Sequence, residues 1–132
     1  PIRMERQQEN ALKVANWLRS NPKVDKVYYI GLPDFPGYDV NASQARGTGS
    51  MISFSTKDVE TAHKTLQTVK MITFAESLGG TESLITYPMM QTHPDVPKER
   101  REALGITDKL LRLSVGLEAA DDIIADLAQA ME

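Results

Sequence analysis

Cysteine is absent from this sequence of 132 residues, and histidine occurs only twice, as His63 and His93. Without thiols the chain can form neither a disulfide framework nor a thiolate-bound metal site, and an intracellular location is permitted. Two histidines without ligand spacing do not suggest a metal site either. No apolar run approaches the roughly 20 residues of a membrane-spanning helix, and the N-terminus lacks the apolar segment of a signal peptide. We therefore expect an untargeted protein without a bound metal or a membrane partner.

Positive charge is not in excess. The sequence has 15 lysines and arginines against 18 acidic residues, a formal net charge of -3 and a pI of about 5.4. This balance gives no basic surface for nucleic acid, so we expect no nucleic-acid partner. The chain begins with Pro1 rather than methionine, which fits either removal of an initiator or a piece cut from a longer protein.

Helical periodicity is clear at both ends of the chain and once between them. Apolar residues at i, i+3, i+4 and i+7 predict a helix over residues 3–20. A second helix is predicted up to about residue 69, with Ser55 and Asp58 as its capping box and His63 partly buried on its apolar stripe. Acidic residues from Glu118 onward favour the start of a last helix. Its predicted buried stripe consists of Ile124, Leu127, Ala128 and Met131.

Strands are predicted by short runs of β-branched and apolar residues. These runs cover residues 24–30, 51–54, 71–75, 83–87 and 111–115. Shorter helical stretches are predicted over residues 38–45 and 98–104. The combination predicts an α/β (α+β) layer, in which helices pack on a mostly antiparallel sheet of about four or five strands. We expect residues 1–132 to form one domain.

Arg112 is the most informative single residue, because the leucines and the valine around it indicate a strand of the core. An arginine there must meet an anion or be costly to bury. A guanidinium can hold a carboxylate through two parallel hydrogen bonds, so a substrate carboxylate is a natural partner. The residues alone leave two other interpretations open. One is an internal ion pair with Glu82 or Glu118, and the other is an edge strand with Arg112 in water.

Ser77 lies just before the glycine pair Gly79 and Gly80. It could present a hydroxyl and free backbone N–H groups to a ligand oxygen, because glycines let the backbone approach closely. An ordinary turn joining two strands explains the same residues equally well. His93 lies in a loop and could face a site, although hydrogen bonding to local backbone is the simpler interpretation. Neither Gly-rich segment has the spacing of a dinucleotide-binding or P-loop motif.

Four motifs in order resemble one family. They are ESLGGTESLI at residues 76–85, QTH at 91–93, LGITD at 104–108 and LRLSVGLE at 111–118. Together they resemble the C-terminal part of the Cys/Met-metabolism pyridoxal-phosphate enzymes, the family of cystathionine γ-synthase, cystathionine γ-lyase, cystathionine β-lyase and methionine γ-lyase. Further similar segments near residues 10 and 27–33 extend the resemblance over the whole chain.

The resemblance implies specific roles for four residues. Arg112 matches the arginine that binds the substrate α-carboxylate, and Ser77 matches the serine beside it. Thr92 matches a threonine near the substrate. Glu76 stands at a position associated with the choice between β- and γ-chemistry, and its carboxylate resembles the γ-synthases and γ-lyases. Pro94 is a departure, since the family usually has a small residue there.

The resemblance also implies what this chain lacks. The Schiff-base lysine, the aromatic residue that stacks on the cofactor and the phosphate-binding residues have no match here. Pyridoxal phosphate would therefore be bound by a larger, missing domain upstream, and we expect this chain alone to be inactive. The parent would be a cytoplasmic trans-sulfuration enzyme, acting on a sulfur amino acid and assembling as a homo-oligomer such as a homotetramer. The alternative is a free-standing α/β module that binds an amino acid or a protein partner.

Overall fold

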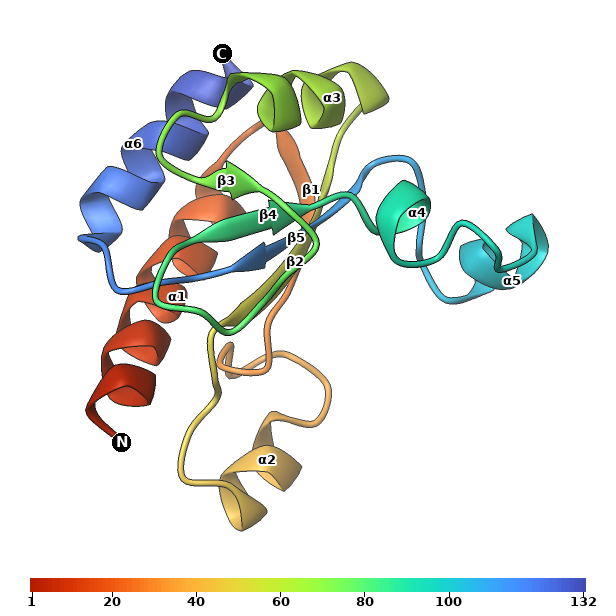
Figure 1. The fold of residues 1–132 in the computed structure, drawn as a ribbon. Coiled ribbons are helices and arrows are strands. Elements are labelled where there is room, and N and C mark those ends of the chain that lie inside the picture. Colours follow the sequence, from red (N-terminus) through yellow and green to blue (C-terminus); the bar gives the residue numbers. More distant parts are fainter.

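One sheet organises the computed structural model, which describes residues 1–132 (Figure 1). The five strands lie in the order β1-β2-β5-β4-β3. In chain order the elements are α1 (Ile2–Ser20), β1 (Val24–Tyr28), α2 (Tyr38–Gln44), β2 (Met51–Thr56), α3 (Val59–Thr68), β3 (Thr73–Phe74), β4 (Leu84–Thr86), α4 (Pro88–Gln91), α5 (Lys98–Ala103), β5 (Leu110–Ser114) and α6 (Ala120–Met131).

The strand pairing is antiparallel everywhere except at one edge. β1 pairs with β2, β2 with β5, and β5 with β4 in antiparallel fashion, whereas β3 and β4 run parallel. The prediction of a mostly antiparallel sheet with helices packed on it is confirmed. Parallel neighbours cannot be joined by a tight turn. The interpretation of the glycine pair as an ordinary turn between two strands was therefore wrong, and residues 75–83 form a crossover loop instead.

The core lies between the sheet and the helices α1, α3 and α6, which cover one of its faces (Figure 1). Alternate residues of the two central strands point into it, and Ile52, Phe54, Leu111 and Leu113 are all completely buried. α1 contributes the predicted apolar residues, because Ala11, Val14, Ala15 and Leu18 are buried as well. Burying each large side chain contributes about 1.5–3 kcal/mol. The other face of the sheet is left to more polar residues.

Three local predictions were wrong. Ser55 belongs to β2, and the N-cap of α3 is Asp58, whose carboxylate accepts a hydrogen bond from the Thr61 N–H. His63 is exposed rather than partly buried, although its Nε2 lies 3.3 Å from the Tyr87 hydroxyl. In α6 the buried stripe includes Ile123 and Ala130 in place of Ile124 and Ala128, since the helix packs against both α3 and α1.

The turn between α3 and β3 is fixed by a buried carboxylate from α6. Asp126 accepts hydrogen bonds of 2.8 to 3.1 Å from the backbone N–H groups of Lys70, Met71 and Ile72, and one of 3.0 Å from the Gln129 amide. Burial alone would raise the pKa of Asp126, but these donors outweigh it and hold the pKa below its usual 3.8. The carboxylate therefore stabilises the edge of the sheet in its charged form.

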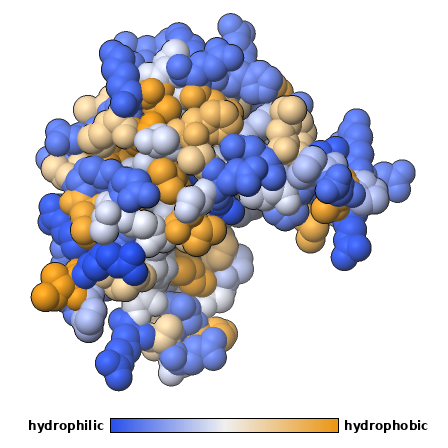
Figure 2. Space-filling view, in the orientation of Figure 1, coloured by the Kyte–Doolittle hydropathy of each residue, from blue (hydrophilic) through white to orange (hydrophobic).

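An arm that carries α4 and α5 projects from the end of the sheet (Figure 1). α5 has no buried residue, and hydrophilic side chains cover most of this arm in Figure 2. Tyr87 ties the base of the arm to the sheet, because its hydroxyl donates a 2.9 Å hydrogen bond to the Asp108 carbonyl oxygen. None of the helices combines the length and the apolar character needed to cross a bilayer.

Candidate functional site

A row of side chains crosses the face of the sheet that the three core helices leave uncovered. Residues directly opposite one another in neighbouring strands share a face. Tyr28 of β1 is opposite Ser53 of β2, Ser53 is opposite Arg112 of β5, and Arg112 is opposite Thr86 of β4. The polar row therefore runs across the middle of the sheet, with Arg112 at its centre.

Arg112 is held at this position by neutral groups. Its Nη2 donates a 2.8 Å hydrogen bond to the carbonyl oxygen of Glu76 and a 3.2 Å hydrogen bond to Oγ1 of Thr86. Oγ1 of Thr86 donates in turn to the Ala75 carbonyl oxygen at 2.7 Å. The guanidinium is thus fixed between β4 and the start of the crossover loop, and its charge is not neutralised by these contacts.

The charge of Arg112 has no carboxylate partner in the chain. The two salt bridges of the structure join Arg19 to Asp34 and Lys98 to Glu102. Nε of Arg112 is buried and makes no hydrogen bond. Arg112 therefore forms no internal ion pair with Glu82 or Glu118. It does not lie on an edge strand either, because β5 is the central strand of the sheet. A buried, unpaired guanidinium N–H favours an anion as its partner.

An open pocket of about 300 Å³ lies beside the guanidinium. It is lined by residues of the polar row and of the arm, namely Tyr28, Ser53, Pro88, Thr92, His93, Leu104, Gly105, Ile106, Leu110 and Arg112. We call it the Arg112 pocket. A larger hollow of about 440 Å³ at the β1 edge contains Arg19 and Asp34. These two residues pair with each other, so their charges are already satisfied. The Arg112 pocket is therefore the better candidate for a ligand.

The structure brings some of the predicted site residues to Arg112 and not others. Thr92 lines the Arg112 pocket, and its hydroxyl lies 2.7 Å from Nδ1 of His93, which also lines the pocket. Glu76 contacts Arg112 through its backbone carbonyl, while the residue as a whole is exposed. Ser77 is exposed and lies outside the pocket lining, and its hydroxyl makes no hydrogen bond within the chain.

Sequence reasoning missed the residues that surround Arg112 on the sheet. Thr86 supports the guanidinium, and Ser53 and Tyr28 line the pocket. The available signal was the alternation of Ser53 with the buried residues Ile52 and Phe54, which indicates a polar face on β2. The register that sets Ser53 and Thr86 opposite Arg112 involves strands far apart in the sequence, and the alternation alone does not give that register.

The lining suits one end of an amino acid better than it suits an aldehyde cofactor. It contains one guanidinium, several hydroxyls and no lysine or carboxylate. A guanidinium and hydroxyls are donors for an α-carboxylate. Covalent attachment of a pyridoxal cofactor needs a lysine amine, and none is present in the lining of this pocket. The residues present thus fit a carboxylate and do not fit covalent attachment of the cofactor.

Known proteins are similar to this chain in sequence and in fold. The model of the family described as Cys/Met metabolism PLP-dependent enzyme matches residues 1–132. The chain is 48% identical over 126 residues to the chloroplastic cystathionine beta-lyase of Arabidopsis thaliana, covering 96% of this chain and 27% of that protein. It is 51% identical over 132 residues to the L-methionine gamma-lyase of Fusobacterium nucleatum subsp. polymorphum, covering 99% of this chain and 33% of that protein.

The solved structures agree. A crystal structure of cystathionine gamma synthase from Xanthomonas oryzae pv. oryzae in complex with cystathionine superposes with a TM-score of 0.93 and 40% identity, over 98% of this chain and 34% of that one. The chain spans between 27% and 34% of the length of these relatives. Beta-lyases and gamma-lyases match at similar identity, 48% and 51% in the two cases above, so overall identity does not favour either chemistry.

Proposed function

The chain belongs to the Cys/Met metabolism PLP-dependent enzyme family, and we propose that it is the C-terminal, substrate-carboxylate-binding part of a larger trans-sulfuration enzyme. The observation that carries the proposal is the unpaired guanidinium of Arg112 on the central strand, with its Nε buried and without a partner. In this proposal the partner of Arg112 is the α-carboxylate of a sulfur amino acid. The similarity to lyases and a synthase of sulfur amino acids supports that choice.

In this proposal each group around the substrate carboxylate has its own task. Arg112 binds it through parallel N–H···O hydrogen bonds, which fix direction as well as position. Thr86 and the Glu76 carbonyl hold the guanidinium in place before the substrate arrives. Such fixed positioning contributes to rate because the reacting bond is already oriented when the substrate binds. We propose Thr92, which lines the pocket, and Ser77, which follows Glu76 in the exposed crossover loop, as further hydrogen-bond groups for the substrate.

Pyridoxal phosphate supplies the electron sink for this chemistry when it is bound. In our proposal the upstream domain of the parent enzyme binds it, and the present chain orients the substrate. We propose a γ-synthase or γ-lyase type of enzyme, because Glu76 has a carboxylate at the position that the family resemblance associates with the choice between β- and γ-chemistry. We propose that the chain by itself is inactive, because the Arg112 pocket offers no lysine to the cofactor. We further propose a cytoplasmic homo-oligomer for the parent.

The proposal is tested by replacing Arg112 in the intact enzyme. Arg112→Ala should raise KM for L-cystathionine and lower kcat/KM, because the substrate loses its carboxylate contact. A more specific readout is the acid preference, defined here as the Kd of L-methioninamide divided by the Kd of L-methionine. Hydrogen bonds to a charged group contribute about 1.5–3 kcal/mol, so Arg112→Ala should lower the acid preference about 10- to 100-fold.

Arg19→Ala serves as the matched control, since Arg19 pairs with Asp34 at the surface, away from the Arg112 pocket. This variant should keep the acid preference of the wild type. Kinetics and acid preference that do not change in Arg112→Ala would contradict the proposed function.

A further inference from the structure

One face of α1 carries three hydrogen-bond donors that point at the far end of the crossover loop. Arg3, Gln7 and Asn10 are spaced i, i+4 and i+7, so they lie on the same side of the helix. Gln7 and Asn10 are both completely buried. Buried amides are uncommon in a helix that otherwise presents an apolar face to the core. The hydrogen-bond partners of these side chains indicate their role.

Every partner of these three side chains is a backbone carbonyl oxygen of the crossover loop or of the segment after β5. Arg3 donates to Gly79 at 2.6 Å. Gln7 donates to Gly80 at 2.6 Å and to Val115 at 3.1 Å. One amide therefore joins the loop to the end of β5.

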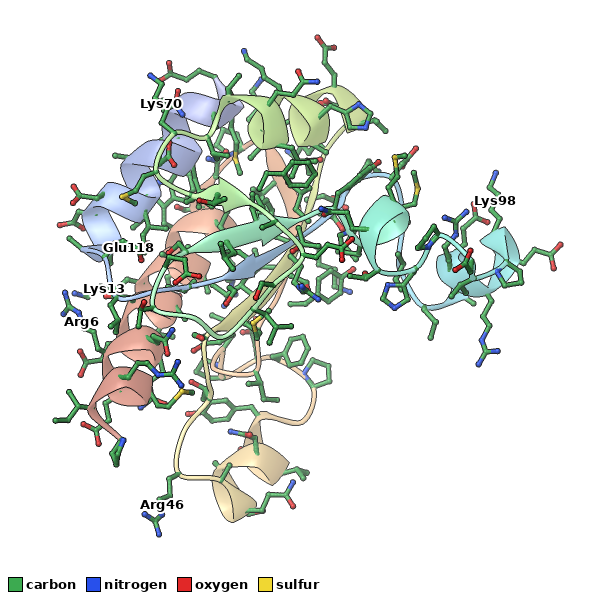
Figure 3. All side chains as sticks on the ribbon, in the orientation of Figure 1. Arg6, Lys13, Arg46, Lys70, Lys98 and Glu118 are labelled. Carbon is green, nitrogen blue, oxygen red and sulfur yellow. The ribbon has the colours of Figure 1, made fainter.

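Asn10 acts on the same region from one turn further along the helix. It donates to the carbonyl oxygens of Gly116 at 3.1 Å and of Glu118 at 2.8 Å. The Glu118 carboxylate then accepts hydrogen bonds from Ser83, at 2.6 Å from the backbone N–H and 2.8 Å from the hydroxyl. Figure 3 shows Glu118 where the segment after β5, α1 and the crossover loop meet. Asn10 thus reaches the end of the loop through Glu118.

The two ends of the crossover loop are therefore anchored on different structures. At its far end Gly80 and Ser83 are tied to α1 and to the segment after β5, and the Gly79 N–H donates to Oγ of Ser114 at 2.8 Å. At its near end the Glu76 carbonyl contacts Arg112. Between them, the exposed side chain of Ser77 has no partner in the chain. At the near end, Ala75 is also hydrogen-bonded to Ile85 and Thr86 of β4. The far end therefore acts together with these contacts in setting the path of Glu76 and Ser77 past the guanidinium.

We propose that Gln7 and Asn10 are positioning residues for the carboxylate site. They act through the crossover loop on the Glu76 carbonyl and on Arg112, and neither touches the substrate. This inference rests on the proposed function, because it assumes that Arg112 binds the carboxylate. It adds that the site depends on a helix that contributes no residue to the lining of the Arg112 pocket.

The chemistry of the contacts supports positioning over simple packing. All partners of the two amides are acceptors, so within each amide only the NH2 group can satisfy them. The amide oxygens of both residues accept no hydrogen bond from the protein. The amides thus act on the structure through their donors alone. A methionine at position 7 would fill similar space and leave the loop without this contact.

The experiment measures the acid preference of the intact enzyme for Gln7→Met, with Gln8→Met as the matched control. Gln8 is the next residue of α1, and its amide oxygen accepts a hydrogen bond from the Thr48 N–H, away from the loop. Misplacing a group by about 1 Å can cost about 100-fold in rate. For a loop with its other anchors intact, we expect Gln7→Met to lower the acid preference about 3- to 10-fold. Gln8→Met should leave it unchanged.

A merely structural role of Gln7 would weaken the binding of acid and carboxamide alike, and the ratio would not move. The double variant Gln7→Met/Arg112→Ala should show no loss of acid preference beyond that of Arg112→Ala, because both changes act on one contact. If Gln7→Met proves too unstable to purify, Arg3→Met decides by the same criterion. Arg3 is an exposed residue of the first turn of α1 and reaches Gly79 from there, and we expect about a twofold loss.

The outcomes separate the two proposals. Loss of acid preference in Arg112→Ala together with an unchanged ratio in Gln7→Met and Arg3→Met would overturn the positioning role and leave the proposed function intact. An unchanged ratio in Arg112→Ala would overturn the proposed function itself. A fully additive loss in the double variant would also overturn the positioning role, since it would show that Gln7 acts independently of Arg112.

Discussion

Replacing Thr86 by valine removes one support of the Arg112 guanidinium without changing the size of the side chain. Thr86 is 1% exposed, and its Oγ1 accepts from Nη2 of Arg112 at 3.2 Å while donating to the Ala75 carbonyl at 2.7 Å. Hydrogen bonds to charged groups contribute about 1.5–3 kcal/mol, and the 3.2 Å contact is at the long end of the usual range. We take about 1.4 kcal/mol for it, which corresponds to about a tenfold change in an equilibrium constant.

The assay is the acid preference of the intact enzyme. Thr86→Val should lower the acid preference about tenfold. Thr86→Ser, which keeps the hydroxyl, should retain most of the acid preference of the wild type. Thr56→Val is the matched control. Thr56 is also completely buried on a strand, but its hydroxyl donates to the Asp58 carbonyl, away from Arg112. A support of Arg112 by the Thr86 hydroxyl would be refuted if Thr86→Val kept the acid preference of the wild type. It would also be refuted if Thr56→Val lowered the acid preference by as much.

Three further perturbations test the framework that holds the site. Asp126→Asn should destabilise the fold by about 2–4 kcal/mol near neutral pH, because one of the amide's polar atoms becomes a donor facing the N–H groups of residues 70–72. The pKa of Asp126 is lowered in the folded state, so its stabilisation is present above the unfolded pKa near 3.8 and is lost as pH falls through the folded value. Chemical denaturation from pH 7 to pH 2 should therefore show the gap between wild type and variant closing in acid, and a constant gap would contradict this account. Gly116→Ala should disrupt the crossover loop, since a Cβ there would approach the backbone of Thr81 and Glu82 to 2.4 and 2.6 Å; a variant with wild-type stability and acid preference would show that the loop is not packed this closely. Leu113→Ala should cost about 2–5 kcal/mol of stability by leaving a cavity in the core, and a loss below about 1 kcal/mol would mean that Leu113 is not a central core residue.

The helices and the class of the sheet were predictable because their signals are local. The stripe in α1 from Ala11 to Leu18 fixes its buried face, and the alternation around Arg112 identifies a strand with one polar position. The errors at Ser55 and in α6 arose where a neighbouring element decides the result. The residue that caps α3 depends on where β2 ends, which is after Ser55. The buried face of α6 depends on its packing against both α3 and α1.

The site was predictable only in part, for a related reason. Arg112 could be selected from the pattern of its strand and Thr92 from the family resemblance, and both line the same pocket. The partners of Arg112 could not, because Thr86 and the Glu76 carbonyl reach it through strand register and through a parallel crossover. The buried donors of α1 follow the same rule. In the sequence alone, Gln7 and Asn10 are only polar interruptions of an amphipathic helix. Their role becomes visible from their hydrogen bonds to the segment after β5 in the structure.

The most direct test of the carboxylate site is a crystal structure of the intact enzyme with L-cystathionine bound. We expect the substrate α-carboxylate at about 2.7–2.9 Å from the guanidinium nitrogens of Arg112, with the buried Nε as one of its donors. The contacts of Nη2 with Thr86 and with the Glu76 carbonyl should be kept. A carboxylate bound elsewhere, with Nε of Arg112 still unpaired, would contradict the central claim.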